Sequence, residues 1–586
     1  MKIFKLLRGS IPVVVAILGL LIAQALCELS LPRYMADIVD VGIMQLSAGS
    51  AEQAAFLWSM AGTMLLLCLG TIAASAAASF LAARTAARIA RDLRQRIFDR
   101  VLLLSPAQVA SVGQASLITR STNDVQQVQN VIVMLLRMVM YAPVMGAVAI
   151  FQVVTLGGGM GWIVAAAVLA VLGLVAVLFT LTMPRFRRMQ KLIDRVNAVT
   201  REMLDGLMTQ RAFGRQDWEL DRFDAASIDL MRTQLFVNRA MTFMMPSMMI
   251  IMNLSGVAIV WFGAQAASAG IMQAGSIMAY ISYATMIVSA FLIVSMVAVM
   301  LPRAEVAVTR IQDVLDREPA VTDPAAPQAI AASAPRGALA FDHVSFAYPD
   351  AAGNVVSDVS FATEAGAVTA IVGSTGSGKS TLVQLAPRLF DPTEGRVTLD
   401  GVDLRSLALE DVRARVGYVP QKGFLFSGTV AANVAYGAEG AAEADVRQAL
   451  ADAQADFVFD LEGGLDAPIA QGGTNVSGGQ RQRLAIARAL AVNPEVLVLD
   501  DSFSALDYAT DARLRQALAA RAQGMAVLVV AQRIATVMHA DKILVLDEGR
   551  VVGEGTHEEL LRTCPTYLEI TKSQLSEAEL GLREGE

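Results

Sequence analysis

Residues 373–380 read Gly-Ser-Thr-Gly-Ser-Gly-Lys-Ser. They follow the short apolar run Ala367–Val372 and precede a helical pattern, which is the strand–loop–helix context of a phosphate-binding P-loop. The glycines let backbone N–H groups point at phosphate oxygens, and the start of the helix adds its positive end. The stretch therefore predicts a site for ATP and Mg²⁺ on an α/β domain. Its predicted nucleotide-binding residues are Gly373, Ser374, Thr375, Gly376, Ser377, Gly378, Lys379, Ser380 and Thr381.

Two side chains of this loop have defined roles in such a site. Lys379 neutralises charge on the β- and γ-phosphates, and Ser380 supplies a hydroxyl ligand to Mg²⁺. A second apolar run, Val496–Leu499, ends in Asp500 and Asp501. An acidic residue at the end of a buried strand beside a P-loop is placed to hold Mg²⁺ through water, although alone it is more often a turn residue. We therefore expect Asp500 to serve the metal.

A second helix start carries the residues of an anion-binding site. Ser477, Gly478, Gly479 and Gln480 open a clear helical pattern. Alone this is a weak signal, because Gly-Gly turns before helices are common. One domain does not need two γ-phosphate sites, however, so this helix start makes sense if it serves the nucleotide of a partner domain.

Composition indicates a membrane protein of more than one domain. The chain has 586 residues, too many for one hydrophobic core. It is 55% hydrophobic and 17% charged, against about 25% charged residues in soluble chains. The net charge of −7 gives no basic surface for nucleic acid. Cys27, Cys68 and Cys564 lie far apart and show neither a disulfide framework nor metal-ligand spacing.

Six apolar segments are long enough to cross a bilayer, since a span needs about 20 apolar residues. The basic connections between them predict that both termini are cytoplasmic, because Lys and Arg gather in cytoplasmic loops. The first segment has no small-x-small cleavage site after it, so we expect a retained helix rather than a signal peptide. The predicted spans are 11–31, 56–83, 131–156, 161–183, 244–267 and 277–301.

The helical pattern continues beyond the second and fourth spans. After span two, apolar Ile89, Leu93, Ile97 and Val101 recur at helical spacing. We expect helices that extend into the cytosol, the alternative being amphipathic helices that lie on the membrane surface. The predicted domains are a transmembrane domain over 1–316, a Pro- and Ala-rich linker over 317–337 and a soluble domain over 338–586.

Two charged residues fall inside apolar runs, where charge is costly and often functional. Glu28 lies in the first predicted span and Arg137 in the third. Each is a candidate to contact a transported compound, although an extended helix could place Arg137 outside the bilayer. The sequence assigns a definite role to neither residue.

Taken in order, these motifs resemble the ATP-binding cassette family, and within it the exporter-type half-transporters that carry the membrane domain first. The resemblance covers nearly the whole chain. It implies an all-α six-span membrane domain with long cytosolic helix extensions, followed by an α/β P-loop ATPase cassette. It also implies that Tyr348 stacks on adenine, that Gln421 contacts Mg²⁺ and senses the membrane domain, and that Ser477–Gln480 is the signature motif.

The same resemblance extends to the segments between the motifs. Ser504–Asp507 matches the D-loop, so Asp507 is expected at the nucleotide interface. Thr119–Asp124 resembles the first intracellular coupling region. Arg211–Gln216 resembles the second, which in such exporters reaches the partner's cassette. Leu31–Asp40 looks like the end of the first span in bacterial multidrug half-transporters.

Two positions depart from the family pattern. The family has Glu where this chain has Asp501, and a switch His where it has Gln532; the only histidines are His343, His539 and His557. Asp is one methylene shorter than Glu, and even a 1 Å misplacement costs about 10²-fold in rate. Gln cannot become the cation that His can. We expect Asp501, Gln532 and Gln421 to form a slow catalytic site, the alternative being two tolerated substitutions.

These observations predict an ATPase coupled to transport in the inner or plasma membrane. The expected activity is export of a hydrophobic or amphipathic compound by a heterodimer with a second, non-identical half-transporter, in which this chain supplies one slow ATP site. One alternative is a lipid flippase or siderophore importer of the same architecture. Another is a nucleotide-gated regulatory or channel subunit. The sequence does not name the substrate.

Overall fold

The computed structural model describes residues 6–156, 159–330, 336–349, 351–438 and 440–575. The chain forms two compact units. The first comprises Met1–Asp99 and Ala115–Asp316, and the second comprises Arg100–Gln114 and Arg317–Glu586. The first unit is helical, and the second holds the sheets of an α/β domain.

Within the residues that the structure describes, six helical segments are long and apolar enough to cross a membrane, as the sequence predicts. Helix α3 runs without a break over 53 residues, about 80 Å at 1.5 Å per residue, whereas a bilayer core is about 30 Å thick. The predicted extension is therefore confirmed, and a separate surface-lying helix after span two is excluded. The helices of this half of the chain are η1 (Arg8–Ser10), α2 (Ile11–Asp37), η2 (Ile38–Ile43), α3 (Ala51–Leu103), α4 (Pro106–Val112), α5 (Gln114–Thr119), η3 (Arg120–Asp124), α6 (Val125–Met134), η4 (Leu135–Val139), α7 (Met140–Thr155), α8 (Gly161–Asp205), α9 (Leu207–Phe213), α10 (Gln216–Ser268) and α11 (Ala274–Leu315).

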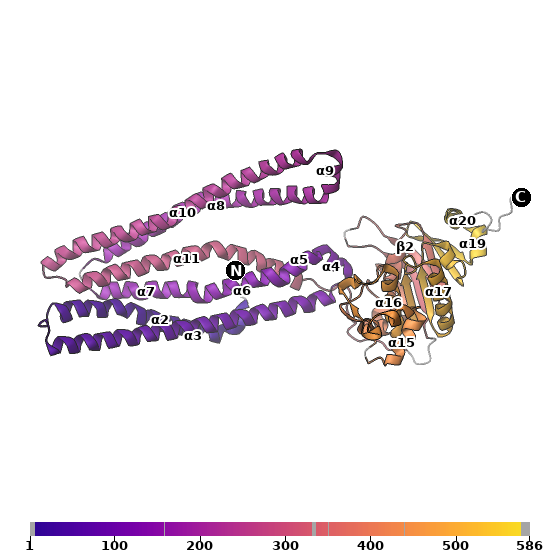
Figure 1. Cartoon of the computed structure of the whole chain (residues 1–586), viewed down its shortest axis with the longest axis horizontal. Helices are drawn as coiled ribbons and strands as arrows, with labels where there is room; N and C mark the ends of the chain where they lie inside the picture. Colours follow the sequence, from indigo (N-terminus) through magenta and orange to yellow (C-terminus); the bar gives the residue numbers. More distant parts are fainter. Residues whose placement is uncertain (1–5, 157–158, 331–335, 350, 439, 576–586) are drawn as a thin grey trace. The chain divides into compact units, whose positions relative to one another are not determined.

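Helices α2, α7 and α11 share one apolar core. Small and aliphatic side chains of α2, such as Ala25 and Leu29, pack against Tyr280 and Tyr283 of α11. The hydroxyl of Tyr280 donates to the carbonyl oxygen of Val153 at 3.1 Å, and that of Tyr283 donates to the carbonyl oxygen of Leu29 at 2.8 Å. Helices α8 and α10 run side by side as a second pair and are joined by α9 (Figure 1).

A buried carboxylate ties the end of the first span to the start of the sixth. Asp40 lies in the π-helix η2 and accepts a hydrogen bond of 2.6 Å from the backbone N–H of Gly275 near the start of α11. A Cβ atom at position 275 would lie 2.4 Å from the carbonyl oxygen of Ala36, so only glycine allows this approach. The carboxylate thus satisfies one of the free N–H groups at the start of α11.

The segment that resembles the first coupling region packs against α11. Its last five residues form the π-helix η3. Arg120 donates to the carbonyl oxygen of Arg310 at 2.9 Å and pairs with Asp313 at 2.7 Å, while Arg310 lies 3.4 Å from the buried Asp124. Burial raises the pKa of Asp124, and the nearby arginines oppose that shift. These contacts hold the extensions of the third and sixth spans together.

The soluble unit contains a six-stranded sheet of order β12-β11-β3-β10-β9-β6, in which all neighbours are parallel except β11 and β12. An antiparallel sheet of order β2-β1-β4-β5 and a β7-β8 pair complete the strands. The strands are β1 (Leu339–Phe346), β2 (Val356–Thr363), β3 (Val368–Gly373), β4 (Glu394–Leu399), β5 (Val402–Asp403), β6 (Val416–Val419), β7 (Gly428–Thr429), β8 (Pro468–Ile469), β9 (Val496–Asp500), β10 (Ala526–Val530), β11 (Lys542–Asp547) and β12 (Arg550–Gly555).

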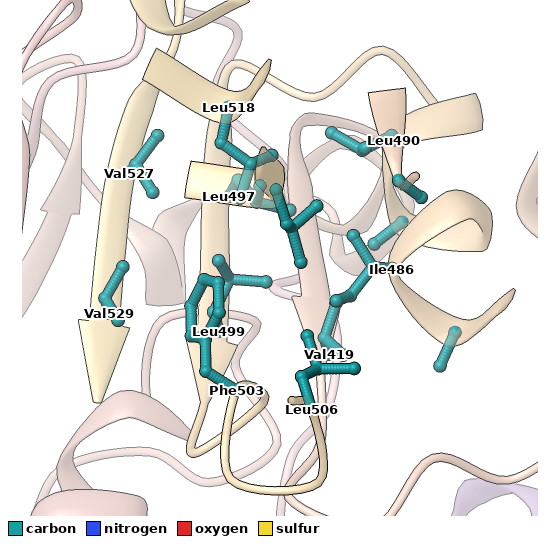
Figure 2. Close-up of a cluster of buried hydrophobic side chains, with 14 of the residues drawn as sticks. Val419, Ile486, Leu490, Leu497, Leu499, Phe503, Leu506, Leu518, Val527 and Val529 are labelled. Carbon is teal, nitrogen blue, oxygen red and sulfur yellow. The ribbon is translucent and has the colours of Figure 1, made fainter. Parts of the chain in front are cut away.

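The core of this unit lies between the parallel strands and the helices that cover them. Figure 2 shows Leu497 and Leu499 of β9 and Val527 and Val529 of β10 facing Ile486 of α16 and its neighbours. Because both faces of the parallel strands are covered, their sequences are continuous apolar runs. The helices are α12 (Lys379–Val383), α13 (Leu409–Arg415), α14 (Val430–Val434), α15 (Glu443–Asp452), α16 (Gly478–Ala491), α17 (Tyr508–Arg521), α18 (Ile534–Val537), α19 (His557–Thr563) and α20 (Pro565–Lys572).

Two segments outside the sheets belong to the second unit. Helix α4 is anchored there through Gln108, whose side-chain amide donates to the carbonyl oxygen of Glu318 at 2.8 Å, and through Ser111, which accepts from Arg317 at 2.9 Å. The residues that follow α11 contain no helix or strand over 317–330. They are nevertheless held to the domain, since Thr322 accepts from Arg388 and Asp323 accepts from the N–H of Leu409.

Candidate ATP site

The P-loop connects β3 to α12, as the sequence predicts. Lys379 begins α12, and its ammonium group donates to the carbonyl oxygens of Gly373 and Ser374 at 2.9 and 2.6 Å. Burial lowers the pKa of Lys379, while Asp501 and Asp500 oppose the shift. At Gly373 a Cβ atom would lie 2.0 Å from Leu546 O, so the start of the loop requires glycine.

Asp500 lies at the end of β9 and faces the P-loop. Its carboxylate accepts a hydrogen bond of 2.8 Å from Ser380, and the Tyr418 hydroxyl lies 3.5 Å from its other oxygen. Burial raises the pKa of Asp500. Burial and the neighbouring Asp500 together raise the pKa of Tyr418 to about 12. Nothing in the spacing of Tyr418 along the sequence indicates that it contacts Asp500.

The two residues that depart from the family pattern lie in contact with each other. The same oxygen of Asp501 accepts hydrogen bonds from the side-chain amides of Gln421 at 3.0 Å and Gln532 at 2.9 Å. Asp501 is buried and has a φ of 46°, a left-handed conformation that Asp tolerates better than most residues. The three predicted catalytic residues are therefore brought together, and two amides fix the orientation of the carboxylate.

A cavity of about 260 Å³ opens at this cluster. Its lining combines the P-loop with the ends of β10 and of the segment after β6. The lining residues are Val355, Thr375, Gly376, Gly378, Lys379, Ser380, Thr381, Gln421, Asp501, Val530 and Gln532.

The residues at the cavity fit a nucleotide with Mg²⁺. The loop offers backbone N–H groups and a buried ammonium group to phosphate oxygens. Ser380, Asp500 and Gln421 offer the hydroxyl, carboxylate and amide oxygens that Mg²⁺ prefers. Among the described residues no three His, Cys, Asp or Glu side chains form a metal cage. Bound Mg²⁺ would take its other ligands from phosphate and water, and would neutralise phosphate charge.

Tyr348 lies just after β1 and adjoins the P-loop helix. Its hydroxyl lies 3.1 Å from that of Thr381, and its ring meets those of Phe346 and Phe390 edge to face, with centroids 5.0 and 5.6 Å away. Both contacts are edge to face, so neither neighbouring ring is stacked on Tyr348. The side chain is half-buried.

The signature segment begins α16. Ser477 is the N-cap, and it forms a reciprocal pair with Gln480: each side chain accepts from the backbone N–H of the other residue. At Gly479 a Cβ atom would lie 3.1 Å from the carbonyl oxygen of Ala505, so the signature packs closely on the D-loop. Asp507 ends the D-loop as the N-cap of α17, and its hydrogen bond from the Thr510 backbone lowers its pKa. The signature does not line the cavity at Lys379.

A residue near the C-terminus holds the switch segment in place. Gln574 donates to the carbonyl oxygen of Gln532 and accepts from the N–H of Ile534, both at 2.8 Å. It is therefore a positioning residue for Gln532. Sequence reasoning missed it because the two residues are 42 positions apart and Gln574 belongs to no motif.

This fold and cavity define a P-loop ATPase domain joined to a six-helix membrane domain. Residues 14–291 match the model of the ABC transporter transmembrane region, and residues 356–504 match the ABC transporter model. An uncharacterized ABC transporter ATP-binding protein of Mycobacterium tuberculosis is 38% identical over 574 residues, 97% of each chain. An ATP-dependent lipid A-core flippase of Pseudomonas putida is 33% identical over 505 residues, 85% of this chain and 82% of that protein.

A solved structure resembles the chain over nearly its whole length. The structure of a bacterial Atm1-family ABC exporter with ATP bound has a TM-score of 0.79 and 26% identity, covering 98% of this chain and 99% of that one. The chain belongs to the ABC transporter family, as an exporter-type half-transporter whose membrane domain precedes its ATPase domain. It is a multi-pass membrane protein.

Proposed function

We propose that this chain forms one half of a heterodimeric exporter of hydrophobic or amphipathic compounds and contributes one slow ATP site. The observation that carries the proposal is the binding of Asp501 by Gln421 and Gln532. Two amide hydrogen bonds to one oxygen of Asp501 lower the basicity that the carboxylate needs to polarise water, and Gln532 cannot become a cation. A homodimer would then contain two slow sites.

The remaining assignments rest on the sequence pattern and on the resemblance to the family. The transmembrane domain comprises 1–316, the linker 317–337 and the cassette 338–586, with both termini in the cytosol. Lys379, Ser380, Gln421 and Asp500 hold ATP and Mg²⁺ together with the other P-loop residues, and the signature of this chain completes the partner's site. Helix α9 exposes Met208 and Phe213, which are 80% and 76% accessible, and docks on the partner's cassette.

Transport by the assembled pair tests the proposal. In inside-out vesicles that contain this chain and its partner, we expect ATP-dependent accumulation of an amphipathic dye. This chain purified alone should hydrolyse ATP slowly. Rapid hydrolysis by the chain alone would contradict the asymmetric arrangement, and ion currents without ATP-dependent accumulation would favour a channel subunit.

A lipid substrate is the second candidate, because a relative with 33% identity is described as a lipid A-core flippase. Vesicles that contain a fluorescent phospholipid distinguish the two. ATP-dependent movement of the lipid between leaflets, without dye accumulation, would favour the flippase.

Replacement of the adenine-facing ring tests the nucleotide site. We expect Tyr348→Ala to weaken ATP binding about tenfold, because base–aromatic stacking contributes about 1–3 kcal/mol. Binding of a fluorescent ATP analogue to the full-length chain measures the change. The control is Tyr348→Phe, which keeps the ring and removes only the hydroxyl near Thr381. Equal losses in both variants would assign the effect to the hydroxyl and contradict stacking.

A further inference from the structure

Glu28 is the only carboxylic acid in the six predicted spans, and Arg137 is the only basic residue. Glu28 lies on α2, and its neighbours Ala25 and Leu29 are buried in the core shared with α7 and α11. An ionisable side chain in such surroundings is costly in free energy, and residues of this kind often have a function.

The carboxylate of Glu28 contacts a phenol rather than a cation. The hydroxyl of Tyr141 on α7 donates to Glu28 Oε2. The side chain of Gln24, one turn before Glu28 on α2, also lies near the Tyr141 hydroxyl. The aromatic ring, the amide and the carboxylate thus form one polar cluster at the α2–α7 contact.

Among the side chains that the structure describes, no Lys or Arg forms an ion pair with Glu28. Arg33 lies further along α2 and Arg137 precedes Tyr141 by four residues, but both are exposed. Glu28 and Tyr141 are each half-buried, so a ligand can approach them without unfolding the helix contact. The cluster therefore offers a negative charge and an aromatic ring, the two groups that recognise organic cations.

We propose that Glu28, positioned by Tyr141, binds the positive group of an amphipathic organic cation, and that such cations are the preferred substrates. The apolar body of the ligand would lie on the adjoining helices. This inference rests on the proposed export function and specifies its substrate class.

Equilibrium binding of ethidium, a permanent cation, and of calcein acetoxymethyl ester, which is uncharged, tests the proposal on the assembled transporter in nanodiscs. We expect Glu28→Gln to weaken ethidium binding at least about tenfold relative to the ester, because a hydrogen-bonded charge is replaced by a neutral amide. Adding Gln24→Glu to that variant returns a carboxylate to Tyr141 and should restore ethidium binding. Arg137→Gln also removes one charge, but a positive one, so it should not weaken ethidium binding relative to the ester.

Equal losses for both dyes, or failure of Gln24→Glu to restore binding, would show that Glu28 is structural and overturn the proposal. Unchanged ethidium binding, or none by the parent transporter, would overturn it as well. Glu28-dependent binding without ATP-dependent accumulation in vesicles would confirm the site and contradict the export function.

Discussion

Ser477→Arg should lower the ATPase activity of the assembled transporter by more than about tenfold. The substitution removes the N-cap of α16 and places a large cation at a helix start that favours anions. Loss of one preorganised donor at a reacting oxyanion costs about 10²–10³ in rate. Under the proposed arrangement this signature completes the fast site on the partner, so the main activity is lost although the P-loop of this chain is intact.

Two matched variants serve as controls for Ser477→Arg. Ser477→Ala removes the cap and leaves space for nucleotide, so it should reduce ATPase activity less than the arginine does. Asp501→Asn changes the slow site and should reduce the activity of the pair only modestly. Steady-state ATPase assays on the three complexes provide the ranking. A larger loss from Asp501→Asn than from Ser477→Arg would contradict the asymmetric pair.

The second large expected effect is a gain in ATPase activity. The double variant Asp501→Glu, Gln532→His should raise the ATPase rate of this chain purified alone about 10²-fold, the cost of a 1 Å misplacement in a catalytic group. Each single variant should gain much less. With Asp501→Glu alone, Gln421 and Gln532 still offer two amide donors to the carboxylate; with Gln532→His alone, the acid remains one methylene short.

Phosphate release by the purified chain measures this gain. The control is the double variant with Lys379→Ala added, which should remove the gain because the P-loop no longer binds phosphate. An unchanged rate in the double variant would show that Asp501 and Gln532 do not limit hydrolysis. It would also remove the main reason for a heterodimer.

The parts that sequence predicted well are those fixed by local pattern. The apolar run Val496–Leu499 lies in β9, and the Gly-rich stretch before Lys379 is the loop between β3 and α12. Continuous apolar strands and glycine spacing are signals that a short window contains. The six membrane helices could also be predicted from the sequence, because the thickness of the bilayer sets the minimum length of an apolar segment that crosses it.

What the sequence did not predict depends on contacts between distant residues. Tyr418 meets Asp500 across a separation of 82 residues, and Tyr141 meets Glu28 across 113. No periodicity reports such pairs. The π-helices at Arg120–Asp124 and Leu135–Val139 were also missed, since one extra residue in a helical turn leaves the apolar pattern nearly unchanged.

The close contact of Asp40 with Gly275 has a mechanical consequence. Because the carboxylate caps α11 and no side chain separates the two backbones, the end of the first span and the start of the sixth must be displaced together. Helix α11 continues for 42 residues, about 63 Å, before the chain enters the ATPase unit at Arg317. A compound bound at Glu28 would therefore contact the helix whose end is joined to α11, and the chain continues from α11 directly into the ATPase unit.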